Sequence, residues 1–440
     1  MGRAILLLAS GAILVAMVGC SLCHHGRRSG ASCPAGDEMP LPVVERTNPE
    51  MVLQELAVTV QPPGQLEPTT DYRALAPQVC QCLAAKHAPL ADAFDNKWQQ
   101  SEQKQRHGCC QGRRKSEKQR ALQASMLRYS ALEIRDQAAG AALEWYYQLA
   151  GAEAKTDLLN DSLEHGRKTL EDVKHLKKLG ITLPQPIEEY ERQVVELKLE
   201  QARNQLTIEQ LNSKLRLAMR YQATHAWRFL PDPGAPLGAE TVADVEAAVQ
   251  LGLAQRPQLL LLRSMIAHLD RDTLGSANSL LQSINPLLAM SEPGPSCKLL
   301  ALLGKILHIQ PGQEDEVENV RAQLRDYLRE RERTVTAEIR EAAYEVRARR
   351  TAILLAREAS SSWEKRIRDL KTKQSEKMPV FAELAGAYQD SFKARGEVVK
   401  EFLGWKIAAV KLKQAQGILP AECGYLDGQA ACGLASPQCR

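Results

Sequence analysis

The chain has 440 residues, of which 44% are hydrophobic and 25% charged, an ordinary balance for a folded protein. Its 27 Gly and 22 Pro are too few for a collagen-like or Pro/Gly-rich disordered chain. With 57 Lys and Arg against 53 Asp and Glu, the net charge is only +4, so we expect no nucleic-acid partner. The aromatic content of 5% is low for a β-sandwich or barrel core.

The N-terminus begins with an apolar run over residues 4–18, which is too short to span a bilayer comfortably. Gly19, Cys20 and Ser21 follow at the expected cleavage point, and this arrangement resembles a bacterial lipoprotein signal. The resemblance implies acylation of Cys20 and attachment to membrane lipid through it. Simple secretion and an uncleaved anchor are the alternatives.

Eleven cysteines in an exported chain predict a few loop disulfides, although their pairing cannot be deduced from sequence. The C-x-x-C-H spacing of Cys20–His24 is that of covalent haem attachment. It lies in a Pro/Gly-rich tether without an evident haem pocket, so we expect no cofactor. His107, Cys109 and Cys110 lack the second cysteine pair that a tetrahedral metal site needs, and we expect no metal.

After the tether, a short helix is expected over about 71–98, then a polar cationic stretch over 99–119. A long helix is expected to follow and to reach Lys178. Its centre carries a coiled-coil seam with alternating spacings of three and four. The seam residues are Leu149, Ala152, Thr156, Leu159, Leu163, Gly166, Leu170 and Val173. Gly180, Pro184 and Pro186 end the pattern, because proline cannot continue a helix and glycine favours a left-handed cap.

A second helix begins after Pro186 and carries its own seam, so the two helices are expected to form an antiparallel hairpin. The same device recurs after a shift of 194 residues, for example from Asn204 to Val398 and from Ile208 to Phe402, and Val194 corresponds to Tyr388. The opposing arm carries a seam that includes Val335, Ile339, Ile353 and Leu370. This repeat predicts an all-α fold, a tandem repeat of long antiparallel coiled-coil helical hairpins. Polar residues interrupt both seams, and they would contribute to the selectivity of a conduit if they face its lumen: Gln201, Asn204, Ser391 and Arg395.

The sequence divides on this reading into six segments. They are a lipoprotein or secretory signal over 1–19, a flexible tether over 20–70, a first helical hairpin repeat over 71–230, connecting helices over 231–315, a second helical hairpin repeat over 316–418 and a cysteine-containing tail over 419–440. Within the connecting segment we expect one amphipathic helix over about 242–274, followed by short helices over 275–312.

Four phrases in this order resemble the TolC-type outer membrane efflux family: Glu144–Ala150, Leu211–Leu217, Ala248–Leu259 with its Arg256-Pro257 pair, and Val410–Gly417. The resemblance covers about residues 120–417 and implies a TolC-like helical domain. It also implies a homo-trimer, working at the outer membrane with a periplasmic adaptor and an inner-membrane pump. The adaptor-contact positions implied at the hairpin tips are Lys177, Lys178, Gly180, Met378 and Pro379.

The chain departs from that family where pairs of membrane-spanning β-strands are expected. The corresponding segments, 99–119 and 275–312, lack the alternation of apolar residues that such strands need. We therefore expect a lipid-anchored protein on the periplasmic side of the outer membrane. It is either an export conduit or a non-conducting coiled-coil protein that tethers or supports the cell envelope. No catalytic motif occurs, and we expect no enzyme.

Overall fold

The structure is a computed structural model of the whole chain. It describes residues 43–44, 71–106, 117–180, 185–221, 227–232, 244–284, 313–375 and 380–425. The chain divides into two units, Met1–Met39 and Pro40–Arg440, and every described residue belongs to the second. The predicted signal over 1–19, the Cys20 anchor, and the tip residues Met378 and Pro379 lie outside the described residues. The predicted domain boundaries stay predictions.

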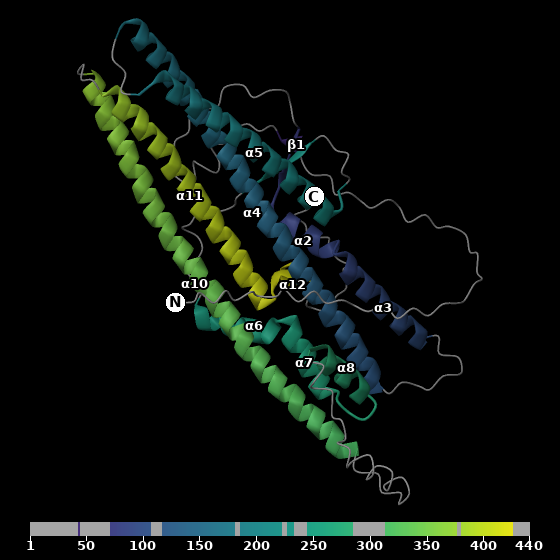
Figure 1. Cartoon of the computed structure of the whole chain (residues 1–440). Helices are drawn as coiled ribbons and strands as arrows, with labels where there is room; N and C mark the ends of the chain where they lie inside the picture. Colours follow the sequence, from purple (N-terminus) through teal and green to yellow (C-terminus); the bar gives the residue numbers. More distant parts are fainter. Residues whose placement is uncertain are drawn as a thin grey trace, which may run out of the picture. The chain divides into compact units, whose positions relative to one another are not determined.

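Four long helices dominate the described part of the chain (Figure 1). They are α4 (Glu117–Lys178), α5 (Ile187–Met219), α10 (Gln313–Ser375) and α11 (Phe381–Gln416). Lys174 and Lys155 on α4 form ion pairs with Glu191 and Glu200 on α5, at 2.9 and 2.8 Å. Residues nearer the C-terminus of α4 therefore pair with residues nearer the N-terminus of α5, so the first hairpin is antiparallel.

The second hairpin follows the same rule. Arg366 and Arg349 on α10 pair with Glu383 and Glu401 on α11, both at 2.9 Å, so these helices are antiparallel as well. The predicted tandem repeat of long helical hairpins is confirmed.

The two hairpins pack side by side through α4 and α11. Among the described elements, α4 contacts both α5 and α11, and α11 contacts both α4 and α10. The long helices thus form one layer in the order α5–α4–α11–α10, which Figure 1 also shows. Asp161 on α4 reaches Arg395 on α11, and His165 reaches Tyr388, so α4 and α11 are also antiparallel. Neighbouring helices alternate in direction across the whole layer.

The predicted seams are the buried faces of these helices. On α4, Leu149 and Val173 are fully buried, and on α5 Ile208 and Leu215 are at most 1% exposed. The second hairpin buries the predicted residues Val335, Ile339, Ile353, Leu370, Val398 and Phe402 in the same way. Burial of these side chains, each contributing roughly 1.5–3 kcal/mol, is the main force that holds the hairpins together.

Two strands and two helices precede α4, where we expected one helix over 71–98, and a third strand after α5 completes a small sheet. Strand β2 (Tyr72–Leu75) lies between β1 (Val43–Val44), to which it is antiparallel, and β3 (Arg228–Pro231), to which it is parallel. Helices α2 (Pro77–Lys86) and α3 (Pro89–Arg106) follow. The single-helix expectation was wrong because Pro77 and Pro89 disfavour helical backbone at the residue before them.

The connecting segment was also expected to contain one helix over 242–274, and the structure divides it. Helix α6 (Val245–Gln255) ends at Arg256, and α7 (Pro257–Ala267) begins at the next residue. Arg256 has an extended backbone with ψ 122°, as the following proline requires. Helix α8 (Leu274–Ile284) follows, in agreement with the short helices expected from residue 275. Residues 285–312 lie outside the described residues.

These short helices pack on the end of the layer away from the hairpin tips. Val249 and Leu259 join Val335 and Ile339 of α10 in one apolar cluster, and α8 joins α4, α7 and α10 in a second. Helix α12 (Leu419–Glu422) follows α11 and contacts α2 and α4. Within the described ranges, no helix combines the length and apolar character needed to cross a membrane.

Candidate functional site

The first hairpin tip contains three of the predicted adaptor-contact residues. Lys177 and Lys178 are the last residues of α4, and both side chains are exposed. Gly180 follows with φ +74°, and its N–H donates to the carbonyl of Lys177 at 3.0 Å, so glycine here ends the helix. Cations in the last turn also favour the helix C-terminus electrostatically. The structure thus gives these residues a helix-ending role, while their contact with an adaptor stays a prediction.

The polar residues of the first seam are satisfied inside the chain. The side-chain amide of Asn204 on α5 donates to the carbonyl of Ala152 at 2.7 Å and to the hydroxyl of Thr156 at 2.8 Å. Gln201 donates to Asn160 at 2.8 Å. Both side chains are used between α5 and α4, so the condition that they face a lumen is not met in the described chain.

The polar residues of the second seam are turned inward as well. Ser391 is only 6% exposed, and Arg395 lies 3.5 Å from the carboxylate of Asp161 on α4. Burial lowers the pKa of Arg395 and raises that of Asp161, and the ion pair opposes both shifts. Arg395 therefore belongs to the contact between the two hairpins and Ser391 is buried, so the condition that they face a lumen is not met either.

The aromatic phrase at residues 144–150 attaches the small sheet to α4. Tyr146 is fully buried, and its hydroxyl lies within hydrogen-bond distance of the carbonyl oxygens of Leu75, at 2.8 Å, and Asp232. These carbonyls belong to the ends of β2 and β3. Sequence alone marked this tyrosine as part of a helix start and did not reveal the strands it holds.

Two of the sequence phrases meet in space, although about 160 residues of chain separate them. Gly417 ends α11 with φ +71°, and a Cβ added there would lie 2.8 Å from Cδ of Pro257 and 3.0 Å from Cα of Arg256. The guanidinium of Arg256 also donates to the carbonyl of Ala415 at 3.0 Å. Glycine is required here by both the left-handed backbone and the close approach of the α6–α7 break.

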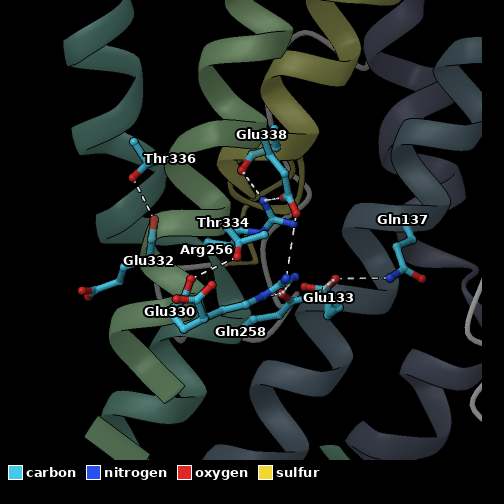
Figure 2. Close-up of polar contacts among 11 residues, drawn as sticks. Glu133, Gln137, Arg256, Gln258, Glu330, Glu332, Thr334, Thr336 and Glu338 are labelled. Carbon is cyan, nitrogen blue, oxygen red and sulfur yellow. Dashed lines mark hydrogen bonds and ion pairs between the residues drawn. The ribbon is translucent and has the colours of Figure 1, made fainter. Parts of the chain in front are cut away.

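A polar network surrounds that contact and joins three elements, as Figure 2 shows. Arg256 pairs with Glu338 on α10 at 2.5 Å, and Gln258 on α7 donates to Glu133 on α4 at 2.8 Å. Arg331 on α10 donates to the side-chain oxygen of Gln258 at 3.0 Å. The network fixes α6 and α7 on the layer and contains no arrangement of nucleophile and base.

A disulfide that sequence reasoning could not pair holds the C-terminal end of the described chain. Cys82 on α2 is bonded to Cys423, with a Cα–Cα distance of 5.3 Å. The side chain of Gln81 donates to the carbonyl of Leu419 at 3.0 Å and to Glu422 at 2.9 Å. Arg135 on α4 lies over the ring of Tyr425 at 4.3 Å. We call residues 418–425 the C-terminal hook.

Asp136 lies beneath the C-terminal hook and is 4% exposed. Burial, together with the nearby carboxylate of Glu133, raises the pKa of Asp136 to about 8, against opposing effects of Arg256 and the N–H of Leu419. Within the described ranges, its Oδ1 has no hydrogen-bond partner. A neutral carboxyl group at this place is consistent with a structural contact between α4 and α12.

The outer faces of the layer carry exposed apolar side chains. On α5 these are Val195, Leu199, Leu206 and Leu217, and on α10 they are Tyr344, Leu354 and Leu355. Helices α5 and α10 are the two edges of the layer, and each has a long helical neighbour on one side only. Among the described residues, no group of three or more His, Cys, Asp or Glu could hold a metal ion.

No protein-family model matches the chain, and no curated protein matches its sequence. Its structure, in contrast, is similar to solved outer membrane proteins. With CusC the TM-score is 0.53 at 10% identity, over 77% of this chain and 91% of CusC. With the CmeC outer membrane channel of Campylobacter jejuni it is 0.51 at 12% identity, over 71% and 72%. With the MtrE outer membrane channel of Neisseria gonorrhoeae it is 0.50 at 12% identity, over 78% and 88%.

The chain has the TolC-type fold. In the described part of the chain, the long helices of this fold form a single layer of alternating direction, with α5 and α10 as its edge helices. Its solved neighbours are channels rather than enzymes. Two of the TolC-like phrases meet at the contact between Gly417 and the Arg256-Pro257 pair. Together they hold the end of α11 against the break between α6 and α7.

Proposed function

We propose that this protein is a TolC-like outer membrane efflux component, a lipid-anchored periplasmic helical conduit that exports substrates together with an inner-membrane pump. The proposal combines the TolC-type fold with contacts between copies of the chain, in which another copy packs against each edge helix of the layer. The single observation that carries it is the pair of exposed apolar faces on the edge helices α5 and α10.

The exposed apolar residues of α5 form a stripe. At about 100° of rotation per residue, Val195, Leu199 and Leu206 lie within about 40° of one another, and Leu217 joins them. This face is roughly opposite the one that carries Tyr190, Ile208 and Leu215 toward α4. Leu206 is 59% exposed and Leu217 is 81% exposed in the single chain. Such a stripe is expected to be covered by another helix.

The edge helix α10 offers a matching surface. Tyr344 and Leu355, which are 57% and 61% exposed, are 11 positions apart and so lie within about 20° of each other. Because neighbouring helices alternate in direction, α5 of one copy placed beside α10 of the next continues the alternation without interruption. A head-to-tail contact of this kind closes into a ring when its rotation permits, and we propose a ring of three chains.

Attachment and partners complete the proposal. Cys20 would carry the lipid that anchors the protein on the periplasmic side of the outer membrane. The disulfide between Cys82 and Cys423 supports an oxidising compartment such as the cell envelope. The hairpin tips, with Lys177, Lys178 and Gly180 on one and Met378 and Pro379 on the other, would contact the periplasmic adaptor of the pump.

The first experiment measures the molar mass of the full lipidated chain in mild detergent by light scattering on a sizing column. We expect a stable trimer. The double variant Leu199→Glu, Leu206→Glu should give a monomer, because it places two charges on the stripe. The matched control is Leu90→Glu, which changes an exposed leucine on α3 and should leave the trimer intact. A monomeric wild-type protein would overturn the ring.

Export itself is tested in cells that lack the gene. We expect reduced tolerance to toxic compounds, restored by the wild-type chain and not by the monomeric stripe variant. A second test uses the double variant Lys177→Glu, Lys178→Glu. It should still form the trimer, but it should not restore tolerance if the tip contacts an adaptor. Unchanged tolerance with altered envelope integrity in the deletion strain would instead support a non-conducting tethering protein.

The lipid anchor has its own test. Mass spectrometry of the N-terminal peptide of the membrane-extracted protein should find a diacylated or triacylated Cys20 as the first residue. Cys20→Ser should release the protein from the membrane fraction. An unmodified N-terminal peptide would contradict the anchor without affecting the ring.

A further inference from the structure

A histidine lies between the two hairpins, in the half of the layer nearer their tips. His165 on α4 stacks on the ring of Tyr388 of α11, with 4.6 Å between ring centroids and an interplanar angle of 24°. The ring of Phe392 lies 5.5 Å away on the same helix. The contact joins the first hairpin to the second, and Tyr388 also packs against the cluster of Ile367 and Leu370 between α10 and α11.

The charged groups around His165 are mainly cationic and come from three helices. Lys168 lies on α4, Lys371 on α10 and Arg395 on α11, and all three disfavour a further positive charge on the imidazole. One carboxylate, that of Glu164, acts in the opposite direction. It is already paired with Lys168 at 2.5 Å, and Arg395 is paired with Asp161.

The ring of Tyr388 is also shared. Lys371 of α10 lies over it at 5.6 Å from its centroid, so one cation already contacts this ring. Half-burial of His165 removes water that would otherwise solvate an imidazolium. Burial is the largest cause that lowers the pKa of His165, and the three cations add to it.

The contact between hairpins is more polar at this level than the seam inside the second hairpin. Asp161–Arg395 and the bond from Gln389 on α11 to Gln193 on α5, at 2.7 Å, are its neighbours. Within the second hairpin at the same end, an apolar cluster of Ile367, Leu370, Val380 and Ala387 holds α10 against α11. Separation of the hairpins near their tips therefore disrupts few apolar contacts, whereas opening of the second hairpin itself disrupts many.

We propose that His165 is a pH-sensitive joint between the two hairpins, which holds α4 against α11 when the imidazole is neutral and loosens that contact when it is protonated. The joint is a property of the single chain and does not depend on the proposed efflux function. The neutral ring stacks on Tyr388 without electrostatic cost. A protonated ring adds a positive charge beside Lys371 and beside Lys168 and Arg395, which are paired with Glu164 and Asp161.

The direction of the pH effect follows from linkage. A histidine whose pKa is lower in the packed state than in the separated state contributes stability at pH values above its ordinary pKa of 6.5. That stability is lost as the pH falls through 6.5 toward the lowered value. Asp161 has a raised pKa because of burial, so its own titration opposes this effect.

The test is hydrogen–deuterium exchange of the full chain at pH 7.5 and pH 5.5, with rates corrected for the intrinsic pH dependence of exchange. We expect a several-fold increase in corrected exchange at pH 5.5 in peptides around 160–170 and 385–396. Peptides from the α6–α7 region should change little. Equal corrected exchange at the two pH values in the wild-type chain would overturn the joint.

Two variants assign the effect to the imidazole. His165→Phe keeps an aromatic ring for stacking and His165→Gln keeps polarity, and neither can be protonated, so both should lose the acid-induced increase. The matched control is His175→Gln, which removes an exposed histidine ten positions further along α4 and should retain it. An increase that persists in both His165 variants would also overturn the proposal.

Discussion

Gly417 at the end of α11 lies directly against Pro257 at the start of α7, with only 2.8 Å between the Cδ of the proline and the place that a Cβ on residue 417 would take. This contact joins the last turn of the second hairpin to the break between two connecting helices. The contact is possible because residue 417 has no Cβ, so even a substitution by alanine should disturb it.

Gly417→Ala should destabilise the protein by about 2–3 kcal/mol, since left-handed backbone costs a residue with a Cβ about 1–2 kcal/mol and the contact with Pro257 adds to it. Thermal unfolding measures the loss. Gly424→Ala is a matched control, because Gly424 has φ +83° with nothing within 4 Å of its added Cβ. It should carry the backbone cost alone. Equal losses in the two variants would show that the contact contributes nothing.

Replacing Cys82 and Cys423 by serine should lower stability by about 2–5 kcal/mol, the usual effect of removing a native disulfide. The hook should also become sensitive to protease, because only non-covalent contacts, among them those of Gln81 and Arg135, then hold it. Limited proteolysis followed by mass spectrometry measures this. Cys80→Ala, which removes the buried free thiol two residues away, is the control and should leave the hook protected. A non-reducing digest without a joined Cys82–Cys423 peptide would contradict the pairing.

Asp136→Asn should stabilise the protein at pH 8.5, on the order of a few kcal/mol. The carboxyl group has a pKa of about 8 in the folded chain because of burial, and 3.8 is its ordinary value. The folded protein therefore holds a proton that the unfolded chain has lost between these values, so this residue's contribution to stability falls as the pH rises from about 4 to 8. Unfolding measured across this range gives the slope.

The asparagine variant should lose that slope and keep the bond from the N–H of Leu419. Asp172→Asn, which removes an exposed carboxylate from the same helix, controls for the change in net charge and should keep the slope. If wild type and Asp136→Asn show the same pH dependence, Asp136 is ionised in the folded protein at neutral pH.

Asn204→Ala should cost about 1–3 kcal/mol, because it removes two hydrogen bonds inside a buried seam and leaves the carbonyl of Ala152 less well satisfied. Denaturant unfolding measures the change. The neighbouring Arg203→Ala alters an exposed position on the same helix and should stay within about 0.5 kcal/mol of wild type. A loss as small in Asn204→Ala as in the control would mean that the seam does not need its polar residue.

The long hairpins could be predicted from sequence because heptad spacing reports directly which face of a helix is buried. Leu149, Ile208 and Val335 are examples of predicted seam positions that the structure buries. The sequence placed the polar residues of the seams on the correct side of each helix, but it did not predict the groups that they contact. Periodicity fixes a direction around the helix axis, and it does not say whether Asn204 meets water or the carbonyl of Ala152.

The short elements were less well predicted, although part of the signal was present. Pro257 and Pro89 both restrict the residue before them, and reading each helix through them produced the two errors in the short helices. The meeting of Gly417 with Pro257 and the pairing of Cys82 with Cys423 depend on contacts between distant segments. Local pattern contains no information about such contacts.

The disulfide between Cys82 and Cys423 spans 341 positions, so almost the whole described chain lies inside one covalent loop. A single cut anywhere between these cysteines would leave two fragments that stay joined until a reductant is added. The loop also cannot close before Cys423 has been synthesised. Oxidation of this pair therefore comes after synthesis of nearly all of the described chain, and it fixes the hook to α2 at that late stage.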